Sequence, residues 1–187
     1  GIVQVLNYFE ENNTAYLVME FLEGATLGSA IEKRGPMPPE VVMEVARSIT
    51  RPLALVHNAG LLHRDIKPDN IFLDKQGRVI LIDFGSVRTF QSGQTVSHTR
   101  LVTPGYAPLE QYSSAAKFGP YTDIYALGAT LLHALTGTMP PPATDLMMGT
   151  KPPAMPASTP SAPQQKAAAR RPPAEGMIRH RPRNMYQ

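Results

Sequence analysis

Cysteine is missing from all 187 positions, and no long apolar run is present. The lack of cysteine excludes a disulfide framework and fits a reducing compartment, so we expect the chain to work in the cytoplasm. No stretch approaches about 18 consecutive apolar residues, so no membrane-spanning helix is expected within this chain, and membrane anchoring elsewhere in a longer protein stays open as an alternative. No secretory signal is visible, and because the first residue is Gly1 rather than methionine, we expect a piece of a longer protein.

A strong excess of one charge sign is also missing from most of the chain. Residues 1–150 carry 11 Lys and Arg against 14 Asp and Glu, whereas residues 151–187 carry 7 against 1. The overall net charge of +3 is therefore a property of the C-terminal stretch. Nucleic-acid binding by the folded part is not indicated. The basic residues of the tail are interpreted as a solvated face, with binding of an anionic partner as the alternative.

The apolar content of 42% suffices for the core of about one domain. Strand-like runs cover residues 2–9 and 14–21, paired as a hairpin around Glu11-Asn12-Asn13, and residues 71–73 and 78–82. Helical spacing of apolar residues predicts helices over residues 26–33, 38–58 and 122–137. In the last helix, Thr122 is the expected N-cap and Gly137 the expected end. Pro52 should bend or break the second helix, at a cost of about 3 kcal/mol if nothing compensates.

Two stretches show no clean period. Residues 86–120 are rich in Ser, Thr, Gly and Pro, and a loop of that length inside a domain is typically functional or disordered. Residues 151–187 contain 8 Pro and 7 Ala with scattered Arg, which favours disorder or loosely packed short helices. The folded domain is therefore expected to cover residues 1–150.

A polar cluster lies between apolar anchors in the stretch LLHRDIKPDNIFLD, residues 61–74. Six polar side chains occupy eight positions: His63, Arg64, Asp65, Lys67, Asp69 and Asn70. Burying such groups is unfavourable unless each has a partner. The pattern therefore predicts a loop that is held at both ends by apolar residues and presents its polar groups to a cleft.

These residue types suit phosphoryl transfer, which needs a positioned hydroxyl, metal ions on the phosphates and cations against the developing charge. Asp65 could accept the proton of the hydroxyl or orient it, and Lys67, on the same side of an extended loop, can reach the phosphate. Asn70 offers a neutral oxygen to Mg²⁺. A second metal ligand is expected from Asp83, which follows the apolar run RVILI and begins the triplet Asp83-Phe84-Gly85.

Four motifs in this order and spacing resemble the eukaryotic-like protein kinases, most closely the bacterial Ser/Thr kinases. They are HRDIKPDN, DFG, GYAPLEQ at residues 105–111 and YTDIYALGATLLHALTG at residues 121–137. Lys67 is the form usual in Ser/Thr kinases, and tyrosine kinases usually differ there. The resemblance implies an α+β, protein-kinase-like fold with a mostly helical C-lobe, a hinge and one or two N-lobe strands. It covers residues 1–150 and leaves residues 151–187 as a degenerate segment or a remnant of the last C-lobe helices.

The resemblance also implies a chemistry, with ATP and Mg²⁺ as cofactors and Ser or Thr hydroxyls of proteins as acceptors. Asp65 would be the catalytic base and Lys67 the phosphate contact, while Asn70 and Asp83 would hold magnesium. The residues implied in adenine binding are Met19 as gatekeeper, Glu20 and Leu22 through their backbone, and Phe72 as the floor of the site.

Further roles are implied for packing and regulation. His63 and Phe84 would stack in an internal apolar spine anchored by Asp123. Arg64 precedes the catalytic aspartate, as in kinases whose activation loop is ordered by phosphorylation. The candidate acceptors of that phosphate are Thr95, Ser97 and Thr99. Thr103 would face the catalytic loop and help to receive the substrate.

Purely structural interpretations stay open for several of these residues. A packed, satisfied histidine is the expected state of His63, and Met19 and Phe72 could be core residues only. A structural role for Asp65, Asn70 and Asp83 is disfavoured by their specific spacing. The other histidines show no metal-ligand spacing and are interpreted as incidental: His57, His98, His133 and His180.

Parts of the family pattern are not found in the chain. It has no Gly-rich loop, no strand lysine and no helix glutamate to pair with that lysine, which fits truncation before Gly1 and predicts poor ATP binding. Met185 stands where the arginine partner of Glu110 is expected, which would leave the carboxylate unpaired. Pro172-Pro173 interrupts an expected helix, which indicates gene decay or an altered reading frame.

Two function classes therefore stay open. The first is a Ser/Thr kinase catalytic domain seen as a fragment, which the intact Asp65, Asn70 and Asp83 favour. The second is an inactive kinase-like binding module or a decayed remnant, which the altered C-terminal end favours.

Overall fold

The computed structural model describes residues 1–89, 102–113 and 115–156, all within one unit, Gly1–Pro156. Strands and helices are interspersed along it, and the two longest helices have 20 residues and 17 residues. The strands are β1 (Val5–Glu11), β2 (Thr14–Met19), β3 (Gly24–Thr26), β4 (Leu61–Leu62), β5 (Ile71–Asp74), β6 (Val79–Leu81) and β7 (Arg88–Thr89). The helices are α1 (Leu27–Arg34), α2 (Pro39–Asn58), α3 (Pro120–Thr136), α4 (Ala143–Met147) and the short 3₁₀ turns η1 (Pro68–Asn70) and η2 (Leu109–Tyr112).

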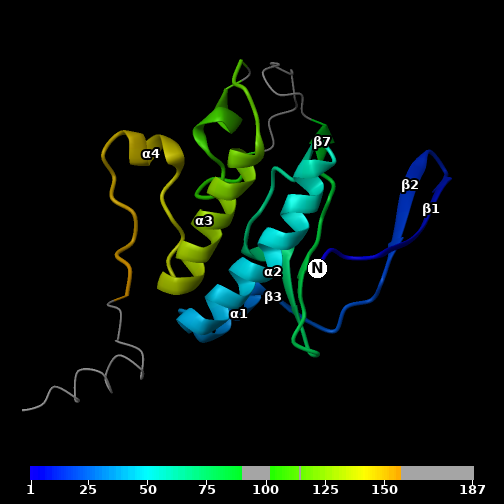
Figure 1. The fold of residues 1–187 in the computed structure, drawn as a ribbon, viewed down its shortest axis with the longest axis horizontal. Coiled ribbons are helices and arrows are strands. Elements are labelled where there is room, and N and C mark those ends of the chain that lie inside the picture. Colours follow the sequence, from blue (N-terminus) through cyan, green and yellow to red (C-terminus); the bar gives the residue numbers. More distant parts are fainter. Residues whose placement is uncertain (90–101, 114, 157–187) are drawn as a thin grey trace, which may run out of the picture. The chain divides into compact units, whose positions relative to one another are not determined.

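The expected N-terminal hairpin is confirmed as the antiparallel pair β1–β2. Asn12 and Asn13 turn it with φ of 51° and 58°, the left-handed values that a tight two-residue turn requires. The first strand begins at Val5 rather than residue 2, because Val3 N–H donates to Leu81 O at 3.1 Å instead. All residues of both strands are exposed, and Figure 1 shows the hairpin set off from the helices.

Strands β3, β5 and β6 form a three-stranded antiparallel sheet in that order. The expected strand pair around residue 77 is confirmed, with Ile71 opposite Leu81 and Leu73 opposite Val79. Asp74 closes the turn, since its Oδ1 accepts the backbone N–H groups of Gln76 and Arg78, each at 2.8 Å. This pair holds residue 70 and residue 83 at the same end of the sheet.

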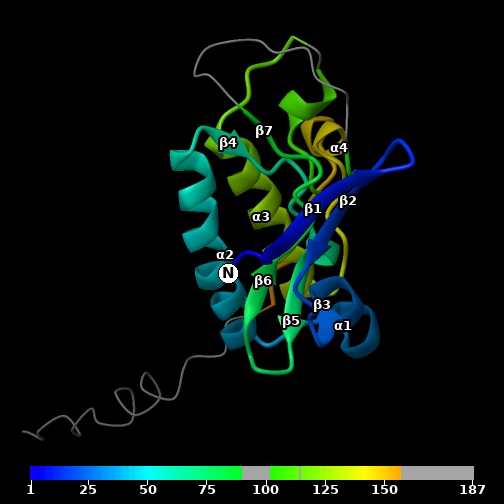
Figure 2. The same cartoon turned by 90° about the vertical axis from the view of Figure 1, so that its right-hand side faces the viewer.

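The core lies between α2, α3 and this sheet (Figures 1 and 2). Helix α2 contributes Val42, Val45, Ile49 and Leu53 at helical spacing, so one face is apolar throughout. Pro52, also buried, does not break it: α2 runs as one helix from Pro39 to Asn58. No helix within the described ranges is long and apolar enough to cross a membrane.

Helix α3 begins two residues earlier than expected, at Pro120, because proline suits the first helical turn. The prediction of Thr122 as N-cap is therefore wrong, and Gly119 is the N-cap. Thr122 is fully buried in the first turn, and its Oγ1 lies 3.5 Å from the Gly119 N–H that it accepts. The expected end at Gly137 is confirmed, with a φ of 68°.

The prediction of an irregular loop over residues 86–120 is partly wrong. Residues 88–89 form β7 on β4, and η2 lies at residues 109–112. Two-residue strands leave no periodic signal, since their partner lies far away along the sequence. Residues 90–101 and 157–187 lie outside the described residues, and so do most of the expected C-terminal segment and Met185.

Candidate active site

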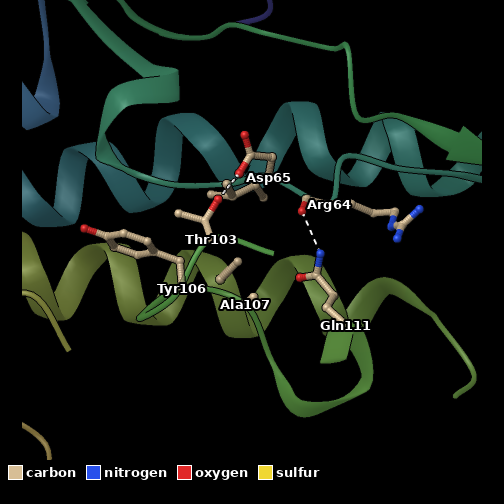
Figure 3. A pocket seen from close by; sticks show the side chains of 8 residues that line it. Arg64, Asp65, Thr103, Tyr106, Ala107 and Gln111 are labelled. Atoms are coloured by element: carbon tan, nitrogen blue, oxygen red, sulfur yellow. Dashed lines mark hydrogen bonds between the residues drawn. The ribbon is translucent and has the colours of Figure 1, made fainter. Parts of the chain in front are cut away.

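The polar loop, residues 63–70, runs from the end of β4 into η1, and Asp65 is its central side chain. The Asp65 carboxylate is buried and has three side-chain donors. Its Oδ1 accepts a hydrogen bond from Thr103 Oγ1 at 2.7 Å. Its Oδ2 accepts from Lys67 Nζ at 2.7 Å and from Asn70 Nδ2 at 3.0 Å. Figure 3 shows Thr103 reaching Asp65 in a small pocket that both line.

These donors set the charge of Asp65. Burial alone raises the pKa of the carboxyl group, but hydrogen bonds from Lys67, Thr103 and Asn70, with the charge of Lys67, hold the pKa below its usual value. Asp65 is therefore a carboxylate at neutral pH. It can accept a hydrogen bond from an incoming hydroxyl group, with a cation held beside it.

The orientation of the Asn70 amide follows from the same contacts. Its Nδ2 donates to Asp65 O at 2.7 Å and to Asp65 Oδ2 at 3.0 Å, which uses both N–H bonds. Its Oδ1 has no hydrogen bond within the described residues. This oxygen is left for another ligand.

Asp83 is brought to the polar loop by the residue before it. Ile82 N–H donates to Asn70 O at 2.9 Å, and Ile82 O lies 3.3 Å from His63 Nε2. Asp83 itself is exposed and has a φ of 60°, which is uncommon for a residue with a side chain. Its Oδ1 accepts the Gly85 N–H at 3.1 Å. Asn70 and Asp83 thus flank the same end of the β5–β6 pair.

His63 is packed among these groups, as the structural interpretation expected. Its ring is fully buried and meets the Phe84 ring edge-on, with centroids 4.9 Å apart. Burial lowers the pKa of His63 against the opposing charges of Asp123, Asp65 and Asp83. A neutral imidazole therefore occupies the site at neutral pH.

Asp123, at the start of α3, holds the backbone of the polar loop. Its fully buried carboxylate accepts the His63 N–H at 2.9 Å on Oδ2 and the Arg64 N–H at 2.8 Å on Oδ1. His57 Nε2, from α2, lies 2.8 Å from the same Oδ2. One carboxylate therefore connects two helices to the loop.

The end of the β5–β6 pair has the oxygen donors that a hard cation such as Mg²⁺ prefers. Asn70 Oδ1 accepts no hydrogen bond within the described residues, and the exposed Asp83 lies two residues after the end of the neighbouring strand β6. No three His, Asp or Glu side chains form a metal-binding group in the described part of the chain. The chemistry of these two side chains fits Mg²⁺, for which they would supply part of a ligand set and water or phosphate oxygens would supply the rest.

Comparison with known proteins assigns the chain to a family. The family model described as "Protein kinase domain" matches residues 1–163. The chain belongs to the protein kinase family. The predicted family and its mixed α+β fold are thereby confirmed.

Similar bacterial kinases extend this finding. Serine/threonine-protein kinase PknL of Mycobacterium tuberculosis is 39% identical over 141 residues, 75% of this chain and 35% of the relative. Serine/threonine-protein kinase F of Synechocystis is 40% identical over 125 residues, 65% of this chain and 25% of the relative. Serine/threonine-protein kinase PrkC of Bacillus subtilis is 38% identical over 145 residues, 75% of this chain and 22% of the relative. The chain spans about a third or less of the length of these relatives.

In this kinase domain, two of the four residues expected at adenine, Glu20 and Leu22, lie on the segment that joins β2 to β3. Glu20 N–H donates to Gln4 O at 2.9 Å, and its side chain accepts the Gln4 N–H. Glu20 O and Leu22 N have no hydrogen bond within the described residues. Met19 ends β2 and is exposed, whereas Phe72 is half-buried on β5 opposite Ile80 and Thr26.

The Arg64 side chain has no carboxylate partner among the residues that the structure describes. Its guanidinium stacks 4.7 Å from the centroid of the Phe118 ring, and its buried Nε has no hydrogen bond within the described residues. Burial and the nearby charge of Arg88 lower the pKa of Arg64, against the charge of Asp123. The expected phosphate acceptors Thr95, Ser97 and Thr99 lie outside the described residues.

Glu110 has a partner that the sequence did not indicate. Its Oε1 accepts a hydrogen bond from Thr122 Oγ1 at 2.8 Å. Thr122 therefore connects η2 to the start of α3, so the expectation of an unpaired Glu110 is corrected.

Three other side chains at the site were not singled out from the sequence. His57 contacts Asp123, and His133 Nδ1 lies 2.6 Å from the Tyr106 hydroxyl, so neither is incidental. Gln111 Nε2 donates to Arg64 O at 2.9 Å. The spacing of His57 from Asp123 carries no local signal, because 66 residues separate them.

Proposed function

We propose that this chain is the catalytic part of a serine/threonine protein kinase that transfers the γ-phosphate of ATP to protein hydroxyls. The observation that carries the proposal is the contact of Thr103 Oγ1 with Asp65 Oδ1 at 2.7 Å, beside Lys67 Nζ. An ionised carboxylate that already accepts a hydrogen bond from one hydroxyl can orient another. The names of the bacterial relatives, each a serine/threonine kinase, agree with this substrate class.

In this proposal, Asp65, Lys67 and Asn70 of the polar loop act together with Thr103 and Asp83. Asp65 orients the acceptor hydroxyl and takes its proton, while Lys67 neutralises charge on the transferred phosphate. Thr103 helps to place the acceptor hydroxyl. Asn70 and Asp83 hold Mg²⁺, which when bound neutralises the charge of the phosphate oxygens.

The nucleotide base would lie against the segment that joins β2 to β3. Glu20 O and Leu22 N are available there as acceptor and donor for adenine. Met19 would border the base as gatekeeper, and Phe72 would lie beneath it. The His63 and Phe84 rings meet edge-on, and Asp123 holds the backbone of the loop that carries His63, which supports their structural assignment.

Regulation in this proposal acts through Arg64. Its guanidinium, with that of Arg88 nearby, offers positive charge for which the described residues supply no ion-pair partner. Phosphate on Thr95, Ser97 or Thr99 would supply one and order the segment that carries it.

The test uses this chain extended before Gly1 by the small-lobe segments of the family pattern, here called the longer protein, with labelled ATP and peptides bearing Ser or Thr. Asp65→Asn keeps the size of the side chain but removes the charge, so kcat should fall by about 10²-fold or more. Nucleotide affinity should stay within about twofold, because Asp65 acts on the acceptor. Glu32→Gln, exposed on α1, makes the same acid-to-amide change as a control and should leave kcat unchanged.

A longer protein that binds ATP but transfers no phosphate to any Ser or Thr peptide would overturn this proposal. That result would instead favour the kinase-like binding module.

A further inference from the structure

The backbone of Arg64, directly before Asp65, has an unusual conformation. Its φ is 68°, in the left-handed region that residues with a Cβ adopt uncommonly. Such a residue persists only where its surroundings hold it. The Asp65 carboxylate follows directly, so any rotation about the Arg64 backbone moves it.

Two buried side chains hold this backbone, one at the Arg64 N–H and one at the Arg64 carbonyl oxygen. Asp123 Oδ1 accepts the Arg64 N–H at 2.8 Å, and Gln111 Nε2 donates to Arg64 O at 2.9 Å. Arg64 O belongs to the peptide group that joins Arg64 to Asp65. The Gln111 contact, drawn in Figure 3, therefore fixes the orientation of the peptide plane from which Asp65 projects.

Gln111 comes from a different part of the chain than Asp123. It lies in η2, eight residues after Thr103, and its side chain is only 3% exposed. Its own backbone is held by the bond of Gln111 N–H to Pro108 O at 3.0 Å. The segment of residues 102–113 thus contacts the polar loop twice, through Thr103 at the Asp65 carboxylate and through Gln111 at the backbone before it.

We infer that Gln111 is a positioning residue, which connects the placement of the segment 102–113 to the orientation of Asp65. The inference rests on the proposed kinase function. Gln111 touches no reacting atom in this role. It acts through the Arg64–Asp65 peptide, so its loss lets this peptide rotate and moves Asp65 away from the acceptor hydroxyl. Small misplacements of a catalytic group lower the rate of the chemical step more than substrate binding.

The test compares Gln111→Met with the wild type in the longer protein. Methionine has a similar length but no N–H donor, so the side chain still fills its place. We expect kcat per folded molecule to fall about tenfold or more, with the KM for ATP within about twofold. Gln76→Met, in the exposed turn after β5, is the matched control and should leave both unchanged.

A purely structural role predicts a different result. In that case Gln111→Met would have a lower thermal stability than the wild type. Its kcat per folded molecule would be unchanged at a temperature where both proteins are folded, and this result would overturn the inference.

Amide hydrogen exchange tests the contact independently of activity. In Gln111→Met, peptides that cover residues 61–70 should exchange faster, while those within α2 should not. Unchanged exchange over residues 61–70 overturns the inference. If the wild type transfers no phosphate but the variant still shows this faster exchange, the proposed function is wrong. The contact of Gln111 with the Arg64 backbone is then still supported.

Discussion

The charge states of single residues in the polar loop depend on their burial and on the hydrogen-bonding and charged groups near them. Asp65 is buried, yet Lys67, Thr103 and Asn70 hold its pKa below the usual value. His63 is buried in the same region, and there burial prevails and lowers the pKa against three carboxylates. Three side-chain hydrogen bonds and the charge of Lys67 outweigh the burial of Asp65, whereas burial of His63 outweighs the carboxylate charges and its contact with Ile82 O.

At this scale, Asp83→Asn tests the metal assignment. The amide keeps the shape but removes the negative charge, so ATP in the presence of Mg²⁺ should bind at least about tenfold more weakly. Binding of ATP without Mg²⁺ should change little, because the lost interaction is with the ion. Isothermal titration calorimetry of the longer protein measures both, with Glu32→Gln as the control.

Equal weakening with and without Mg²⁺ would remove Asp83 from the metal site. It would indicate a direct contact with the nucleotide or a local change of fold.

At the scale of elements, two contacts with α3 hold the segment 102–113 on the helical body. Thr122 donates to Glu110 Oε1 at 2.8 Å from the first turn of α3. Tyr106 contacts His133 farther along the same helix at 2.6 Å. Burial, followed by the charge of Asp69, raises the pKa of Tyr106 to about 12, so its hydroxyl stays protonated. The segment is therefore held at two points along α3.

Thr122→Val tests the first of these contacts. Valine has nearly the same shape but cannot bond to Glu110 or Gly119, so the free energy of unfolding should fall by about 1–3 kcal/mol. Urea denaturation measures the loss. Thr50→Val, exposed on α2, is the matched control and should change stability by less than about 0.5 kcal/mol.

A loss for Thr122→Val no larger than that of the control would show that this contact does not stabilise the start of α3. The position of η2 would then depend on other contacts.

At the scale of the whole molecule, buried histidines couple stability to pH. Burial lowers the pKa of His63 and of His133 below the usual value of 6.5. Well above pH 6.5, these imidazole rings are neutral in the folded protein and in the unfolded chain. As the pH falls below 6.5, the unfolded chain takes up protons before the folded one does, so stability decreases.

The free energy of unfolding should therefore decrease between pH 7.5 and pH 5.5. The slope from the fully buried His63 is at most about 1.4 kcal/mol per pH unit, and the half-buried His133 adds less because water screens it. Urea denaturation at pH 7.5, 6.5 and 5.5 measures this. His133→Gln should show a shallower decrease, and a stability that is flat over this range would contradict the burial effect.

The sequence by itself determined the elements whose signals are local. Helical spacing of Val42, Val45, Ile49 and Leu53 predicted α2, and Asn12-Asn13 predicted the hairpin turn, because both depend on neighbouring residues. The motifs HRDIKPDN and DFG indicated the family, which the comparisons confirmed. The roles of their individual residues stay predictions.

Only the tertiary structure decided which distant groups meet. Several contacts join segments whose apolar residues follow no common spacing. They are the strand pair β4–β7, the contact of His57 with Asp123 and the contact of Thr122 with Glu110. The same holds for Gln111 and Arg64, separated by 47 residues. A buried polar atom needs a partner, but the sequence does not say which one, because packing of the apolar core brings these atoms together. The physical reason is that periodicity reports on local geometry, whereas hydrogen-bond pairing in the interior depends on the fold as a whole.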